Sequence, residues 1–236
     1  MHVLLVHAHP EPSSFNGALR DAIVGETLDS GHSVDVSDLY AQGFDPVGGR
    51  GDFVRAADDA RFHYQSEQTA AALSDGFAPD LAREQDRLRR ADLLILQFPL
   101  WWGGPPAILK GWFDRVAAYG VAYADGTRFD TGLFRGRRSL ISVTTGGTAR
   151  RFSDDDVYGP IEEVLRPVQR LFLGYLGFEV APPHVAYAVA RIGMAEREQA
   201  IADLRLRVRT LLSTPVAAEP VPSSRDLLAS LGDRDW

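Results

Sequence analysis

The sequence predicts an α/β protein: a three-layer sandwich in which helices cover both faces of a five-stranded parallel sheet. Short apolar runs such as 3–6 and 93–98 have the near-continuous hydrophobicity of strands buried on both faces. These runs alternate with amphipathic helical patterns, which is the order of strand–helix–strand units with right-handed crossovers. A chain of 236 residues, 45% of them hydrophobic, is also long enough to bury one such core.

Composition excludes several classes of function. A formal net charge of -7 argues against binding nucleic acid through phosphate neutralisation. The chain has no cysteine, so disulfides, thiol catalysis and cysteine-bound metal clusters are excluded. No apolar run approaches the length of a membrane span, and the N-terminus does not resemble a signal peptide. We therefore expect a cytoplasmic protein that does not insert into membranes.

Hydrophobic periodicity predicts the elements in order. The N-terminal half contains a strand at 3–6, a helix from about 15, a strand at 32–39, an irregular excursion over 41–79, a charged helix at 81–91 and a strand at 93–98. The C-terminal half contains a helix from 106, a loop over 119–134, a strand at 139–145, a helix at 157–173 constrained by two prolines, a strand at 178–181 and a helix at 195–212. Residues 1–213 are expected to form one domain, with 214–236 as a peripheral tail.

Three loops that follow predicted strands hold the unusual residues of the chain. They cover 7–17, 98–104 and 144–148. In open parallel sheets, ligands bind beyond the carboxyl ends of the strands at a switch point of the strand order. Because all three loops would meet at that edge, a ligand site is expected there.

The first loop suits an anion such as a phosphate. It leads into a helix N-terminus, where free N–H groups and the helix dipole favour negative charge, and His9, Ser13, Ser14 and Asn16 add side-chain donors. The simpler interpretation is that a serine merely caps the helix. His7 and His9 do not by themselves predict a metal site, because no third ligand is nearby.

The other two loops suit a flat ring. Trp101 and Trp102, followed by two glycines, offer rigid walls and a close approach of the backbone, although they could also be a hydrophobic corner of the core. Residues 144–147 offer hydroxyls and unobstructed N–H groups that stabilise negative charge on a heterocycle, or else form an ordinary glycine turn. A phosphate site, an aromatic shelf and such donors together describe a flavin site, in which the cofactor carries the hydride chemistry.

Five stretches of the chain resemble the NAD(P)H:quinone oxidoreductase (DT-diaphorase-like) family, which has the flavodoxin-like fold. They are 8–16, 37–40, 97–100, 106–113 and 144–147, and they occur in the family's order with similar spacing. The resemblance implies a homodimer with FAD, rather than FMN, bound at sites on the dimer interface. It also implies a ping-pong reaction in which NADPH or NADH reduces the flavin and leaves, and a quinone then takes the same place and accepts a hydride.

The resemblance further implies the site residues. The expected cofactor contacts are His9, Ser14, Phe15, Asn16, Gly17, Pro99, Leu100, Trp101, Trp102, Gly103, Thr144, Thr145, Gly146, Gly147 and Arg197. The expected substrate contacts are Trp102, Tyr123 and Tyr158. Tyr123 is expected to close over the substrate of the other subunit, and His63 to reach the other subunit's FAD.

The chain departs from the animal members of the family at two positions. Phe152 and Tyr158 stand where those enzymes have a tyrosine and a histidine that are thought to relay charge during hydride transfer. Phe152 cannot donate a hydrogen bond, whereas Tyr158 can do so as a neutral phenol. We therefore expect Tyr158 and the N–H groups of Gly146 and Gly147 to be the catalytic donors. The residues around Gly103 also differ, which predicts a reshaped pocket.

Three other functions are compatible with these residues. They are an azo- or nitroreductase with the same flavin chemistry, a flavin-bearing regulatory subunit of a potassium efflux system, and a flavodoxin-like one-electron carrier. The absence of a Thr/Ser-rich phosphate loop after the first strand disfavours the last. No motif for a 2′-phosphate is present, so the sequence does not separate NADH from NADPH.

Overall fold

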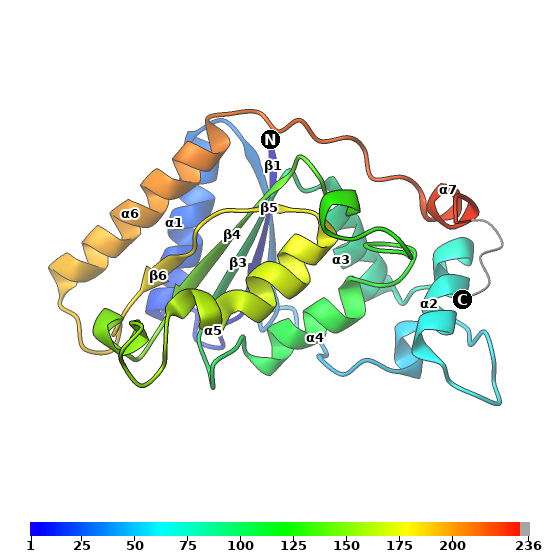
Figure 1. Cartoon of the computed structure of the whole chain (residues 1–236), viewed down its shortest axis with the longest axis horizontal. Helices are drawn as coiled ribbons and strands as arrows, with labels where there is room; N and C mark the ends of the chain where they lie inside the picture. Colours follow the sequence, from blue (N-terminus) through cyan, green and yellow to red (C-terminus); the bar gives the residue numbers. More distant parts are fainter. Residues whose placement is uncertain (232–236) are drawn as a thin grey trace.

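The sheet is parallel throughout and lies between two layers of helices (Figure 1). This computed structural model describes residues 1–231. The strand order is β2-β1-β3-β4-β5, with β6 also paired to β4. The strands are β1 (His2–His7), β2 (Ser33–Asp38), β3 (Leu93–Pro99), β4 (Arg138–Thr144), β5 (Glu179–Val180) and β6 (His184–Ala186). The chain changes direction across the sheet between β1 and β3, so the switch point lies beyond the carboxyl ends of these strands. The predicted fold class is confirmed.

The last position of the sheet differs from the sequence prediction. The sequence predicts one strand at 178–181, but two short strands occupy this edge of the sheet. β5 pairs with the start of β4, and β6 pairs with the end of β4. Pro182 and Pro183 lie between β5 and β6. Proline has no N–H to donate to a ladder, so the strand breaks there and resumes at His184.

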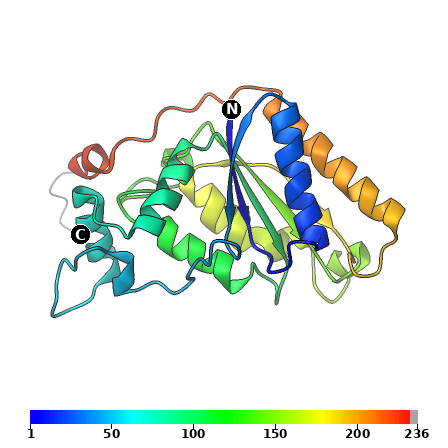
Figure 2. The ribbon, with the colours of Figure 1, turned by 180° about the vertical axis from the view of Figure 1, so that it is seen from behind.

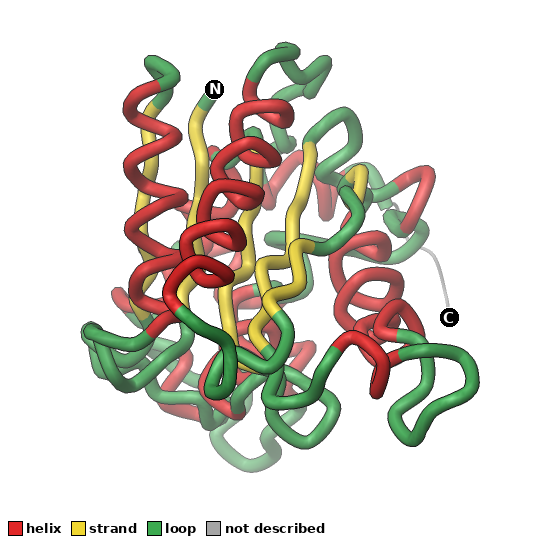
Figure 3. Tube along the Cα trace, turned by 90° about the vertical axis from the view of Figure 1, so that its left-hand side faces the viewer, coloured by secondary structure: helices red, strands yellow, loops and turns green. Residues whose placement is uncertain are grey.

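Helices α1 (Phe15–Asp29) and α6 (Met194–Leu212) cover one face of the sheet, and α3 (Pro79–Arg90), α4 (Ala107–Val116) and α5 (Ile161–Val168) cover the other (Figures 1 and 2). Ile23 and Leu204 are fully buried between the first pair and the sheet, and Trp112 is fully buried on the opposite face. Figure 3 shows the strands running together from the end marked N toward a group of loops. Two buried cores therefore hold the sheet rigidly beneath those loops.

The start of α1 is built as the sequence predicts. The Gly17 N–H donates to the Ser14 Oγ at 3.2 Å, which makes Ser14 the N-cap. A Cβ on Gly17 would lie 2.0 Å from the Pro12 carbonyl oxygen, so only glycine lets the loop pack this closely on the helix. The first loop is thus folded back tightly against the first turn of α1.

The helix predicted over 157–173 is wrong in its first turn and in its regularity. It begins at Ile161, with Pro160 at the N-cap, and Val157 and Tyr158 lie in a turn before it. Pro167 lies inside α5, and the chain then continues as the π-helical turn η4 (Gln169–Gly174). Loss of the proline N–H is the physical reason for irregular hydrogen bonding here.

The excursion between β2 and α3 contains the 3-10 turn η1 (Arg50–Asp52) and α2 (Tyr64–Ser74). The buried Arg115 of α4 holds it, because its guanidinium donates to the Asp52 Oδ1 at 2.8 Å. The C-terminal tail crosses the molecule and places α7 (Ser224–Ala229) beside α2, with Leu227 buried (Figure 1). The remaining short turns are η2 (Phe129–Thr131) and η3 (Ala149–Phe152). No helix among residues 1–231 has the length and apolar character needed to span a bilayer.

Candidate active site

A cavity of about 560 Å³ lies beyond the carboxyl ends of β3 and β4. Its lining residues come from both strand-end loops and from the segment leading into α5: Leu100, Trp102, Gly103, Thr145, Gly146, Gly147, Phe152, Val157, Tyr158 and Val164. Cavities of this size and apolar character are typical of small-molecule sites. The second and third loops of the predicted ligand site therefore meet at one cavity.

The second loop is a tight two-residue turn. The Trp101 N–H donates to the Gly104 oxygen at 2.9 Å, and the Gly104 N–H donates back to the Trp101 oxygen at 3.0 Å. Both central residues have positive φ, 50° for Trp102 and 75° for Gly103, which is costly for a tryptophan. The Trp102 side chain is fully exposed, at 106%. The interpretation as a hydrophobic core corner is therefore wrong for Trp102, whose ring stands in solvent beside the cavity.

The second loop is joined to the third by the backbone. Pro99 is the buried last residue of β3 and lies opposite Thr144 of β4. The Leu100 N–H donates to the Thr144 oxygen at 2.8 Å. This hydrogen bond fixes the position of Leu100, which lines the cavity, relative to the N–H groups of Gly146 and Gly147.

The third loop packs two aromatic rings against a glycine. A Cβ on Gly147 would lie 2.9 Å from the Phe152 ring and 3.2 Å from the Tyr158 ring, and the two ring centroids are 5.0 Å apart. Tyr158 reaches this position because it lies in the turn before α5 rather than inside a helix. The N–H groups of Gly146 and Gly147 donate to no acceptor between residues 1 and 231. They are therefore available to a ligand in the cavity.

The first loop is held by side-chain contacts to the end of β4 and to α6. The Asn16 Oδ1 accepts hydrogen bonds from the Thr144 Oγ1 at 3.1 Å and from the Gln97 Nε2 at 2.7 Å. The Arg197 guanidinium lies 5.7 Å from the centre of the Phe15 ring and donates to the Val189 oxygen at 2.8 Å. All three predicted loops are therefore gathered at one edge of the sheet.

His9 is hydrogen-bonded to the N-cap of α1. A hydrogen bond of 2.9 Å joins its Nδ1 to the Ser14 Oγ, the same oxygen that caps Gly17. The cap interpretation of the serine is correct, and the cap also orients His9. Residues 1–231 contain no group of three His, Cys, Asp or Glu side chains placed to hold a metal ion.

Tyr123 and His63 do not reach the cavity of their own chain. Tyr123 packs against Tyr119 and Tyr175, with ring centroids 5.6 and 6.0 Å apart, and lines a different cavity between α4 and η4. His63 is the exposed N-cap of α2, where its Nδ1 accepts from the Ser66 N–H at 3.3 Å. Their action on the site of another subunit stays a prediction.

Sequence reasoning missed three residues at this edge. His7 and Gln97 form a buried hydrogen bond between the ends of β1 and β3, and Arg191 donates to the Gly146 oxygen. Burial lowers the pKa of His7, which keeps the imidazole neutral. The sequence pattern that could have identified His7 and Gln97 is a polar residue near the end of an otherwise apolar run. No sequence pattern marks Arg191.

The fold and the site define a flavodoxin-like α/β protein with a ligand cavity at the switch point of its sheet. The family model for the flavodoxin-like fold matches residues 1–212. Ribosyldihydronicotinamide dehydrogenase (quinone) of Pongo abelii is 40% identical over 221 residues, which cover 93% of this chain and 94% of that protein. NAD(P)H dehydrogenase (quinone) 1 of Rattus norvegicus is 39% identical over 209 residues, covering 88% and 76%.

Solved structures agree with these relatives. A crystal structure from Klebsiella pneumoniae, of a protein assigned as a quinone reductase, superposes with a TM-score of 0.86 at 38% identity and covers 92% of this chain and 86% of its own. The chain belongs to the NAD(P)H:quinone oxidoreductase family within the flavodoxin-like fold.

Proposed function

We propose that this protein is an FAD-dependent NAD(P)H:quinone oxidoreductase that works as a homodimer. The observation that carries the proposal is the convergence of three strand-end loops on one edge of the sheet, where two of them line a cavity with apolar walls and unused N–H donors. The names of the relatives, quinone dehydrogenases 40% and 39% identical to this chain, support the same reaction.

The residues at this edge fit a flavin. Leu100, Trp102 and Phe152 provide apolar surface for a flat ring, while the N–H groups of Gly146 and Gly147 provide donors for its electron-rich side. The helix N-terminus and His9 suit the phosphates. Arg197, stacked over Phe15 beyond the first loop, supports FAD over FMN because it offers a cation to the outer part of a dinucleotide.

A bound flavin would supply the chemistry of hydride transfer between NAD(P)H and a quinone. The chain itself contributes shape and electrostatics. The exposed Trp102 and Tyr158 line the cavity, where a nicotinamide and a quinone would bind in turn, and one shared binding place supports a ping-pong order. The Tyr158 hydroxyl would donate a hydrogen bond, and Gly146 and Gly147 would stabilise developing negative charge through their N–H groups.

A second subunit would complete the site. Tyr123 and His63 lie away from the cavity of their own chain, which supports the proposal that they serve the partner's. A dimer would also cover the exposed tryptophan ring beside the cavity. The cytoplasmic location stays a prediction.

Purification and steady-state kinetics test the proposal. The protein should be yellow, release FAD on denaturation, elute as twice its 25.9 kDa mass, and oxidise NADH or NADPH when menadione is added. Parallel double-reciprocal plots are expected for a ping-pong order. Protein that stays colourless after addition of FAD and FMN would overturn the proposal.

Two further outcomes separate the alternatives. Yellow protein that oxidises neither nucleotide with any acceptor would indicate a regulatory flavoprotein. Faster turnover with azo dyes or nitroaromatics than with quinones would indicate an azo- or nitroreductase.

A further inference from the structure

A buried chain of polar side chains runs beneath the first loop. The Gln97 Nε2 donates to the Asn16 Oδ1 at 2.7 Å, the Thr144 Oγ1 donates to the same oxygen at 3.1 Å, and the Gln97 Oε1 is hydrogen-bonded to the His7 Nδ1. None of these four residues is more than 4% exposed. They come from the ends of β1, β3 and β4 and from the first turn of α1, so the chain joins all the elements that carry the proposed site.

The direction of these hydrogen bonds follows from His7. The Gln97 Oε1 only accepts, so the His7 Nδ1 carries the proton. The other tautomer would place an N–H on the His7 Nε2, which is buried and has no partner within residues 1–231. An orphaned buried N–H is costlier and rarer than an orphaned lone pair. Burial also lowers the pKa of His7, which disfavours protonation of both nitrogens.

The same direction passes on to Asn16. Because the Gln97 oxygen accepts from His7, the Gln97 amino group faces Asn16. The Asn16 oxygen must therefore be the acceptor of that hydrogen bond. Two donors then fix the Asn16 Oδ1. The Asn16 Nδ2 makes no hydrogen bond within the described chain and, unlike the His7 Nε2, is not sealed from solvent. Asn16 therefore offers a donor at the N-terminus of α1, where a flipped amide would offer an acceptor.

We propose that His7 is a positioning residue that, through Gln97, orients the Asn16 amide so that its amino group faces the phosphates of the bound flavin. The inference rests on the proposed flavin site. His7 is fully buried and would not contact the flavin itself. An outward oxygen would repel a phosphate, whereas an outward amino group adds a charge-assisted hydrogen bond to the free N–H groups of the helix end.

A matched pair of variants tests this relay. His7→Leu keeps the volume but removes the donor, whereas His7→Asn keeps an amide donor close to the position of Nδ1. The dissociation constants of the apoprotein for FAD and for riboflavin, which lacks phosphates, are measured by flavin fluorescence. We expect His7→Leu to bind FAD about tenfold more weakly, with riboflavin unchanged and with FAD affinity restored in His7→Asn.

The same measurements separate the failures. If the wild-type chain binds neither FAD nor FMN, the proposed function falls. If the wild type binds FAD and His7→Leu binds it equally tightly, or loses FAD and riboflavin affinity equally, only the relay falls. A double-variant cycle gives a second measurement: in an Asn16→Ala background, His7→Leu should have no further effect on FAD. An undiminished effect there would show that His7 does not act through Asn16.

Discussion

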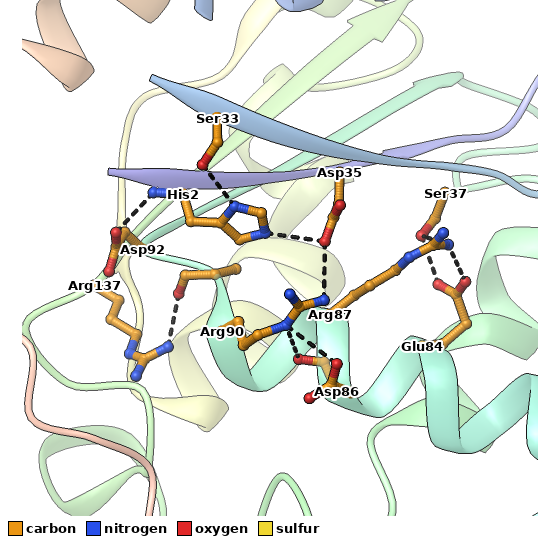
Figure 4. Close-up of polar contacts among 11 residues, drawn as sticks. His2, Ser33, Asp35, Ser37, Glu84, Asp86, Arg87, Arg90, Asp92 and Arg137 are labelled. Carbon is orange, nitrogen blue, oxygen red and sulfur yellow. Dashed lines mark hydrogen bonds and ion pairs between the residues drawn. The ribbon is translucent and has the colours of Figure 1, made fainter. Parts of the chain in front are cut away.

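The two ends of β1 each carry a histidine, and the two are used in opposite ways. At the amino end, His2 has both ring nitrogens partnered, to the Ser33 Oγ at 2.9 Å and to the Asp35 Oδ2 at 3.0 Å (Figure 4). At the carboxyl end, His7 is fully buried, and its Nε2 has no partner among residues 1–231. The histidine at one end of the strand is fully partnered, whereas the histidine at the other end is buried beneath the edge of the sheet that carries the proposed site.

The surroundings repeat this difference. Around His2, Arg90 pairs with Asp35 at 3.2 Å (Figure 4). Nearby, Arg137 donates to the Ala91 oxygen at 2.7 Å. At the other end, the N–H groups of Gly146 and Gly147 are unused, and Trp102 is held with positive φ in solvent. Hydrogen bonds formed within the chain stabilise the fold. Accessible N–H groups without a partner, next to a strained backbone, instead mark a place where a ligand can bind.

The largest expected effect on stability lies at the amino end. Arg137 is 5% exposed, and its Nη1 donates to two backbone oxygens, of Arg89 and Ala91, at 2.7 Å each. Arg137→Ala should lower the free energy of unfolding by about 3 kcal/mol in urea denaturation, because both oxygens lose their partner. Arg90→Ala, where the side chain is 54% exposed, should cost less than about 1 kcal/mol.

A measurement of FAD affinity distinguishes a loss of stability from a change in the binding site. Neither arginine variant should change the dissociation constant for FAD in protein that is still folded. A weaker FAD complex in Arg137→Ala at denaturant-free equilibrium would show that the two ends of the sheet are coupled.

A second buried histidine, His184, should make the free energy of unfolding depend on pH. Burial, together with the nearby Arg207, lowers the pKa of His184 on β6 to about 4. The unfolded chain takes up this proton near pH 6.5, so between these values the unfolded state binds more protons and stability falls as pH falls. The loss between about pH 7.5 and about pH 5 should be about 2 kcal/mol.

Replacement of the histidine isolates this contribution. His184→Gln should flatten the dependence of the unfolding free energy on pH by that amount, as measured by urea denaturation at both pH values. An equal slope in the variant and the wild type would contradict the buried neutral state.

Among cavity residues, the phenol of Tyr158 should matter for rate rather than for binding. Tyr158→Phe should slow flavin reduction by NAD(P)H about tenfold in anaerobic stopped flow, with FAD affinity little changed, because one hydrogen bond to developing charge is lost. Tyr187→Phe is the control, since the Tyr187 ring also packs on Phe152, at 5.8 Å, but lies outside the cavity lining. An unchanged reduction rate in Tyr158→Phe would remove Tyr158 from the mechanism.

The smallest effects are expected at Trp102, where one substitution should raise stability and weaken FAD binding. Trp102→Gly relieves the positive φ of 50° and should raise the free energy of unfolding by about 1 kcal/mol. The same change removes an aromatic wall and should weaken FAD binding about fivefold. Trp102→Ala should weaken FAD binding similarly without the gain in stability. FAD affinity equal to the wild type in both variants would exclude the ring from the site.

The sequence predicts the strands and the three loops because each depends on a local pattern. Apolar runs mark β1 and β3, and prolines and glycines mark the loop after β3. The relay from His7 to Asn16 depends instead on strand register, which sets His7 opposite Gln97 and Pro99 opposite Thr144. Register is fixed by packing across the sheet, so no single stretch of sequence predicts it.

The position of Tyr158 was hidden for a related reason. A periodic apolar pattern over 157–173 indicates a helix, but Pro160 sets the start of α5 at Ile161. The turn that results brings Tyr158 against Gly147. The split of the last strand into β5 and β6 likewise depends on two prolines whose effect on pairing shows only in the sheet.

The dissociation constant of FAD for Gly147→Val tests most directly the claim that the flavin binds at the carboxyl end of the sheet. The added side chain would start 2.9 Å from the Phe152 ring and 3.2 Å from the Tyr158 ring, so these two rings of the cavity lining would have to move. We predict FAD binding weakened at least about tenfold in Gly147→Val. In His2→Ala, at the opposite end of β1, we predict binding equal to the wild type. FAD bound as tightly by Gly147→Val as by the wild type would contradict the account.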